Sequence, residues 1–121
     1  MKTALEIGTA LVTLCREGKN AQAIETLYSK DIKCVEAVAM NGSREAEGMD
    51  AILGKTKWWG ENHTVHSAKI EGPFPFEDRF AVYFNYDVTQ KQSGKRFTMD
   101  EVGVYYVHNG KIVREEFMFK G

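Results

Sequence analysis

The spacing of the apolar residues changes along the chain from the period of a helix to the period of a strand. Near the N-terminus, in residues 3–17 and 20–28, and again in 49–62, apolar side chains recur every three or four positions, as in helices with one buried face. After His63 they alternate, as in strands that bury one face. The pattern predicts an α+β unit with its helices on one side of a sheet.

Three helices are expected. The first spans Thr3–Glu17 and ends at Gly18, because glycine caps a helix C-terminus without steric cost. Asn20 is expected to cap the second helix. The third lies within Met49–Asn62, is expected to end near Gly60, and follows a polar loop, Asn41–Gly48.

Five strands are expected. The first, Ile32–Met40, lies between the second and third helices, and a Gly-Pro-Phe-Pro-Phe turn region at 72–76 interrupts the alternation that follows His63. Ser93-Gly94 and Asn109-Gly110 supply hairpin turns. The last four strands therefore form an antiparallel meander over His63–Glu71, Arg79–Gln90, Lys95–Val107 and Lys111–Phe119.

Length and charge limit the possible functions. At 121 residues the chain has the length of one domain, which we expect to cover residues 1–121. A net charge of −1 without a basic cluster argues against nucleic acid and against a membrane surface as partners. No run approaches the roughly 20 apolar residues of a membrane span, so we expect a cytoplasmic protein. Cys15 and Cys34 lack metal-site spacing and are expected to be reduced, with a disulfide as the alternative.

Two segments and the element order carry a family resemblance. The passage Leu27-Tyr28-Ser29-Lys30-Asp31 and the ending Asn109-Gly110-Lys111-Ile112-Val113-Arg114-Glu115-Glu116-Phe117 resemble the SnoaL-like, nuclear transport factor 2-like superfamily. The resemblance implies a cone-shaped α+β barrel in which three N-terminal helices pack on a strongly curved antiparallel sheet around a pocket. It implies a homodimer through the outer sheet face, where Tyr83, Val104 and Tyr106 are expected. Members include isomerases, cyclases, dehydratases, epoxide hydrolases and proteins that only bind.

The ketosteroid isomerase pattern of that superfamily matches this chain in part. Glu36 falls where the resemblance places the carboxylate that moves a proton on the substrate. The tyrosine that donates to the developing oxyanion would fall near Val12, which has no donor. The partner acid would fall at Gly103, with Glu101 two residues earlier on the same strand face.

Three carboxylates are the predicted catalytic residues: Glu36, Glu101 and Glu115. Period-two counting puts each on a strand face that is otherwise apolar. A carboxylate desolvated among aromatic rings has a raised pKa and suits acid or base work near neutral pH. In the alternative interpretation, Glu101 and Glu115 are ordinary sheet charges paired with Arg96, Arg114 or Lys111.

The predicted substrate-binding residues are mostly aromatic. They are expected to line the pocket together with one histidine as a proton carrier: Trp59, His66, Phe84, Tyr105 and Phe117. In the alternative interpretation, the histidine is an ordinary strand residue hydrogen-bonded to backbone or water, and the aromatic rings are core packing. His63 and His66 fall on opposite faces of a strand, so no metal site is expected. No phosphate loop or nucleophile motif is present, and no cofactor is expected.

Two functions lead at this point, ahead of metal-dependent hydrolysis, which would need three ligands converging at one point. In the first, the pocket binds a small apolar organic molecule and isomerises, cyclises or dehydrates it by cofactor-free proton transfer, with Glu36 as general base and Glu101 or Glu115 as acid or hydrogen-bond donor. In the second, the same fold is a ligand-binding or dimeric assembly module without chemistry. An unpaired carboxylate beside a cavity of a few hundred Å³ favours the first.

Overall fold

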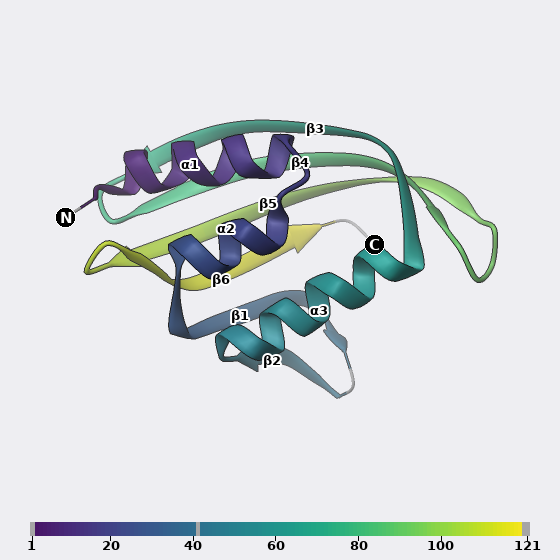
Figure 1. Ribbon diagram of the computed structural model, residues 1–121, viewed down its shortest axis with the longest axis horizontal. Helices are drawn as coiled ribbons and strands as arrows, with labels where there is room; N and C mark the ends of the chain where they lie inside the picture. The colour runs from purple at the N-terminus through teal and green to yellow at the C-terminus, as the bar shows by residue number, and fades with distance from the viewer. Residues whose placement is uncertain (1, 41, 120–121) are drawn as a thin grey trace.

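The computed structural model describes residues 2–40 and 42–119. Three helices and six strands occupy this part of the chain (Figure 1). Their bounds are α1 Ala4–Arg16, α2 Asn20–Leu27, β1 Tyr28–Met40, β2 Ser43–Glu47, α3 Met49–Asn62, β3 His63–Phe76, β4 Arg79–Gln90, β5 Arg96–His108 and β6 Lys111–Phe119.

The helix ends follow local capping chemistry. Thr3 and Glu6 form a capping box at the start of α1, in which each side chain accepts a hydrogen bond from the other's backbone N–H. Gly18 has a φ of +73° after the last turn, as expected for this glycine. The expectation for Asn20 was wrong, because Lys19 is the N-cap of α2 and Asn20 is already helical. Among the described residues, no helix is long and apolar enough to cross a bilayer.

The α+β architecture is confirmed, and the sheet is mixed. The strand order is β2-β1-β6-β5-β4-β3, and the sheet does not close. Adjacent strands are antiparallel except β1 and β6, which run parallel. The wholly antiparallel sheet that the sequence predicted is therefore corrected. No tight turn joins β1 to β6, and strands so far apart in the chain can pair in parallel through a long crossover.

Two segments expected to be loops are strands. The expected polar loop contains β2, an edge strand that pairs with β1 and is exposed almost throughout, so it lacks the alternation that reveals a half-buried strand. The expected turn region at 72–76 belongs to β3, where a bulge between Glu71 and Phe74 interrupts the pairing with β4. The turn itself lies at residues 77–78.

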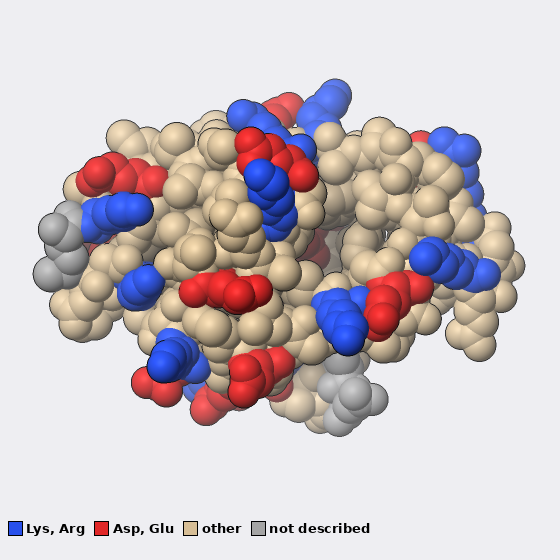
Figure 2. Space-filling view, in the orientation of Figure 1, with Lys and Arg blue, Asp and Glu red and all other residues tan. Residues whose placement is uncertain are grey.

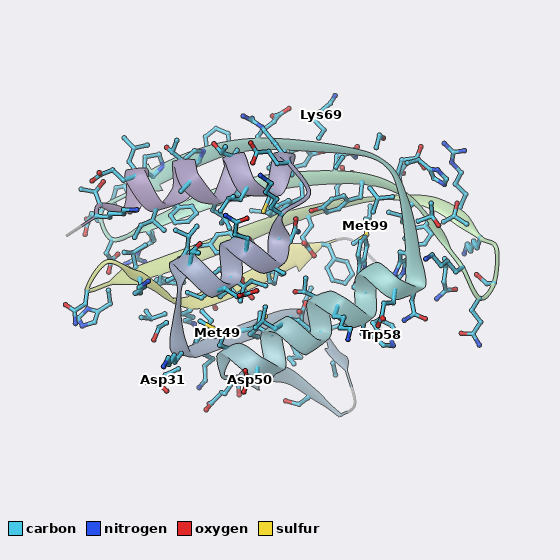
Figure 3. The ribbon with its side chains drawn as sticks, in the orientation of Figure 1. Asp31, Met49, Asp50, Trp58, Lys69 and Met99 are labelled. Atoms are coloured by element: carbon cyan, nitrogen blue, oxygen red, sulfur yellow. The ribbon has the colours of Figure 1, made fainter. Side chains whose placement is uncertain are left out.

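The three helices cover one face of the sheet, here called the inner face (Figure 1). α1 lies over β3 and β4, and α3 lies over β1 and β2. Side chains fill the space between α1, α2 and the sheet (Figure 3). The deepest core residues of the sheet are Ile32, Cys34, Phe80, Val82, Val88 and Ile112. This core holds the strands in the register that determines the site.

The opposite, outer face mixes apolar and charged side chains. The Tyr83 hydroxyl donates to Asp100 over 2.6 Å, and the Arg79 guanidinium lies 5.0 Å from the ring centroid of Tyr106. Val104 shares this face through its pairing with Ala81 and Glu116. The homodimer through this face stays a prediction.

Candidate functional site

Strand register places the three predicted carboxylates on the inner face. Cα partners on neighbouring strands direct their side chains to the same face. Glu101 lies between Phe84 and Phe119, and Glu115 lies between Tyr105 and Cys34. Glu36 follows two residues after the buried Cys34 on β1. The strands thus bring all three acids to the side that the helices cover.

Glu115 is a buried carboxyl with one tyrosine partner. It is 2% exposed, and the hydroxyl of Tyr28, at the start of β1, donates a hydrogen bond to it. Burial raises the pKa of Glu115, while the Tyr28 hydrogen bond and the Lys55 charge lower it in part. Burial also raises the pKa of Tyr28. Glu115 is therefore enclosed and already satisfied by a donor.

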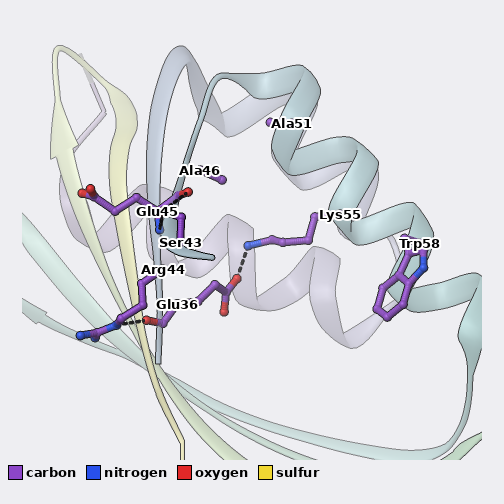
Figure 4. Close-up of a pocket in the computed structure, with 8 residues that line it drawn as sticks. All are labelled: Glu36, Ser43, Arg44, Glu45, Ala46, Ala51, Lys55 and Trp58. Carbon is purple, nitrogen blue, oxygen red and sulfur yellow. Dashed lines mark hydrogen bonds and ion pairs between the residues drawn. The ribbon is translucent and has the colours of Figure 1, made fainter. Parts of the chain in front are cut away.

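Glu36 is paired with a lysine that the sequence analysis did not select. Lys55, on α3, forms an ion pair with the Glu36 carboxylate and lies 3.0 Å from the Cys34 sulfur (Figure 4). Burial lowers the pKa of Lys55, but hydrogen bonds with Cys34 and Glu36 outweigh it, so the net shift is upward. The pair therefore brings a charged ammonium to the inner face.

A cavity reaches the inner face at this ion pair. It measures about 720 Å³ and lies between α3 and the β1–β2 hairpin (Figure 4). Its lining residues are Glu36, Ser43, Arg44, Glu45, Ala46, Ala51, Lys55 and Trp58. Among the described residues, no three His, Cys, Asp or Glu side chains are placed to hold a metal ion.

Glu101 differs from the other two acids because it makes no ion pair or hydrogen bond with a described residue. Burial first, and then the charges of Glu36 and Glu115, raise its pKa to about 7. It is half-buried, so its carboxyl is not sealed from solvent. Figure 2 shows the helix-covered side of the molecule hollowed to the right of its centre, with acidic atoms deep in the hollow.

The alternative ion pairs that the sequence left open do not form. The three basic side chains considered for Glu101 and Glu115 have other partners. Arg96 pairs with Asp87, Arg114 pairs with Glu116, and Lys111 donates to the Thr26 carbonyl.

The four aromatic residues predicted to bind substrate, here called the predicted aromatic wall, divide into core and open residues. Phe84 and Tyr105 are 4% and 2% exposed and belong to the core. Phe117 is half-buried, and the Lys55 ammonium lies 5.9 Å from its ring centroid. Trp59 is half-buried, stacks on His63 at 4.5 Å and lies 5.8 Å from the ring of Tyr86. Of these four predicted residues, Trp59 and Phe117 keep enough exposed surface to contact a ligand.

His66 lies away from this group. β3 has a bulge between Val65 and Ser67, which reverses the alternation of the strand. The His66 ring is exposed and lies 2.6 Å from the Thr89 hydroxyl on the outer face. The proton-carrier role expected for it in the pocket has no geometric support.

Lys55 and Tyr28 are the site residues that sequence reasoning missed. Lys55 lies three positions after Ile52 and four before Trp59, so helical spacing does place it on the buried stripe of α3. That spacing could have revealed a lysine next to an inward acid. Tyr28 fits the apolar stripe of α2, which hid its place at the start of β1.

Gly103 leaves room for two aromatic rings beside Glu101. A Cβ at this position would lie 2.8 Å from the Tyr105 ring and 3.0 Å from the Phe117 ring. We expect Gly103→Ala to lower the free energy of unfolding by about 1 kcal/mol in a urea melt, because the rings must shift and the gain from a less flexible unfolded chain offsets only part of that cost. Gly54→Ala, whose new Cβ meets nothing within 4 Å, is the control. If both variants lower the free energy of unfolding equally, the packing explanation is wrong.

Comparisons with known proteins agree with this fold. A sequence model of the SnoaL-like domain family matches residues 2–119. The structure of a candidate SnoaL-like polyketide cyclase from Mesorhizobium loti has a TM-score of 0.91 and 43% identity, covering 97% of this chain and 99% of that one.

Two further structures resemble this one at lower sequence identity. A nuclear transport factor 2-like protein from Burkholderia thailandensis has a TM-score of 0.83 and 21% identity over 99% of this chain and 92% of that one. A protein from Catenulispora acidiphila with a ketosteroid isomerase-like fold, solved with trimethylamine, has a TM-score of 0.74 and 20% identity over 98% of this chain and 88% of that one. These two show the fold alone. No curated protein matches the chain.

Proposed function

Because the chain belongs to the SnoaL-like domain family, we propose that it moves a proton on a small, largely apolar organic molecule held against the open part of its inner face. The likeness to a candidate polyketide cyclase at 43% identity supports chemistry of the cyclase or isomerase kind. Such reactions need a positioned acid or base and stabilisation of the negative charge that develops on the substrate.

The observation that carries the proposal is the state of Glu101. A general base works best when its pKa lies near the working pH, because it is then both ionised and basic enough to take a proton. Glu101 has a pKa of about 7 and no internal partner among the described residues. Glu36, the base that the sequence favoured, is held by Lys55, so the proton-transfer role passes to Glu101.

The Lys55–Glu36 pair supplies the second requirement. Its ammonium lies at the inner face, over the half-buried ring of Phe117. A cation held in place before the reaction stabilises an enolate or alkoxide without reorganising at the moment of proton transfer. Glu115 acts differently, as an enclosed positioning residue whose charge raises the pKa of Glu101.

A non-catalytic ligand-binding module of the same fold is the second candidate. It is favoured by the burial of Phe84 and Tyr105, which places half of the predicted aromatic wall in the core. In that case Glu101 would bind a ligand group without exchanging a proton with it.

Solvent exchange of a carbon acid tests the proposed function. In D2O, the wild-type protein is expected to accelerate deuterium incorporation at the acidic carbons of 2-tetralone, an apolar ketone, as followed by NMR. The rate should rise with pH through about 7 as Glu101 ionises. Glu101→Gln should lose about 100-fold or more of the catalysed rate, the usual contribution of a general base.

The control is the neighbouring acid on the other face of β5. Asp100 accepts hydrogen bonds from Tyr83 and Asn85 on the outer face, and an asparagine oxygen can accept both. Asp100→Asn should keep the wild-type rate. If wild type and Glu101→Gln exchange the ketone equally fast, the catalytic proposal is wrong and the binding module remains.

A further inference from the structure

Among the described residues, the open part of the inner face combines a carboxylate that has no hydrogen-bond or ion-pair partner with several half-buried aromatic rings. Core residues of this face are fully buried, whereas a second group is half-buried although it points inward. We call this group the acidic–aromatic floor. Its members are Tyr86, Glu101, Phe117 and Phe119.

Register sets the rings around the carboxylate. Phe119 is the direct neighbour of Glu101 on β6, and Phe117 lies two residues before Phe119 on the same strand and face. Tyr86 is the corresponding diagonal neighbour on β4, beside Met99. Diagonal neighbours on one sheet face are within reach of aromatic side chains. Trp59 of α3 adds a fourth ring 5.8 Å from Tyr86.

The described acidic side chains of the inner face outnumber the basic ones. Among the described residues of this face, three carboxylates lie near one ammonium, which is paired with Glu36. Glu115 already accepts a hydrogen bond from Tyr28. The remaining carboxylate, Glu101, makes no ion pair with a described residue, although the Lys55 charge lowers its pKa in part. A cation is already tolerated over one of these rings, since Lys55 lies 5.9 Å from the centroid of Phe117.

We infer that the acidic–aromatic floor binds an organic ammonium ion, with its cationic head against Glu101 and the faces of Tyr86, Phe117 and Phe119. Aromatic faces attract alkylammonium groups through the ring quadrupole, and a carboxylate supplies the counter-charge. A neutral apolar ligand of the same shape would use the rings and leave the carboxylate unpaired. The inference goes beyond the proposed function, because it assigns a charge to the ligand and holds whether or not Glu101 moves a proton.

Ionisation of Glu101 controls such binding. The titratable groups near it are Glu36 of β1, Lys55 of α3, Tyr86 of β4, Tyr105 of β5 and Glu115 of β6, and Cys15 of α1 lies beside the two tyrosines. Burial raises the pKa of Cys15 to about 11, so its thiol stays neutral near pH 7. A pKa of about 7 at Glu101 leaves roughly a tenth of it ionised at pH 6 and nearly all at pH 8.5. Affinity for a permanent cation should therefore fall about tenfold across this range on acidification.

The test compares choline with its neutral isostere, 3,3-dimethylbutan-1-ol. Dissociation constants are measured by NMR titration of the ¹⁵N-labelled protein at pH 6 and pH 8.5. At pH 8.5 the wild type should bind choline at least tenfold more tightly than the alcohol, and the preference should shrink at pH 6. Glu101→Gln should abolish the preference and its pH dependence, while Asp100→Asn should keep both.

The outcomes separate this inference from the proposed function. Equal affinity for the two ligands, a preference that survives in Glu101→Gln, or no binding of choline would each overturn the ammonium site. None of these results affects deuterium exchange of the neutral ketone, which tests proton transfer by itself. Conversely, choline preference without ketone exchange would keep the ammonium site in a protein that only binds.

Discussion

At pH 8, Glu101→Gln is expected to be more stable than the wild type by up to about 3 kcal/mol. Burial beside two other acids raises the pKa of Glu101 from its ordinary 4.5 to about 7. A raised carboxyl pKa means that the folded state holds the proton more tightly than the unfolded state, so ionisation at higher pH costs stability. A pKa increase of this size corresponds to about 3 kcal/mol in the free energy of unfolding. The neutral amide avoids the cost.

The sign of the pH dependence follows from the same pKa values. Below pH 4.5 the Glu101 carboxyl is protonated in both states and contributes nothing to the pH dependence of stability. Between 4.5 and about 7 the wild type loses stability as pH rises, and above that range the loss is complete. Urea melts of wild type and Glu101→Gln at pH 4, 6 and 8 should therefore diverge with rising pH, at an unchanged m-value.

Asp100→Asn is the matched control for this measurement. Hydrogen bonds from Tyr83 and Asn85 lower the pKa of Asp100, opposite to the shift at Glu101. Its variant should not gain stability at pH 8. If Glu101→Gln is instead less stable than the wild type by 1 kcal/mol or more, Glu101 stabilises the fold, and the acid–base proposal for this strand fails.

The sequence predicts the architecture well because most elements bury one regular face. α3 was predicted from its observed first residue, Met49, and the strands Arg79–Gln90 and Lys111–Phe119 were predicted with the observed bounds of β4 and β6. β2 and the end of β3 were missed for a physical reason. An edge strand exposed on both faces has no alternation, and a bulge shifts the alternation by one residue. The parallel pairing of β1 with β6 depends on contacts between distant segments, which periodicity does not report.

The candidate site was predictable in its acids but not in their partners. Period-two counting placed Glu36, Glu101 and Glu115 on the inner face, and the strand register agrees. Whether a carboxylate is paired depends on side chains from other elements. Lys55 reaches Glu36 across 19 residues of sequence, and Tyr28 reaches Glu115 across 87. These contacts single out Glu101 as the acid without a partner, whereas the sequence favoured Glu36 as the base.

Lys55→Met is expected to lower the free energy of unfolding by about 2 to 3 kcal/mol at pH 7. The substitution keeps the length of the side chain and removes the charge that faces Glu36. Both side chains are largely enclosed, with 25% and 15% of their surfaces exposed. Losing one partner of a buried ion pair costs about 3 to 5 kcal/mol, and this partial exposure reduces the effect.

A double-mutant cycle assigns that loss to the Lys55–Glu36 pair. Lys55→Met combined with Glu36→Gln leaves neither charge, so the double variant should recover most of the stability that Lys55→Met loses. The measurement is a set of urea melts of the wild type, both single variants and the double variant at pH 7. If the two losses simply add, the lysine charge stabilises the protein through a contact other than Glu36, such as the Phe117 ring. In that case its ammonium is not held by Glu36, and the electrostatic role assigned to the pair in proton transfer is withdrawn.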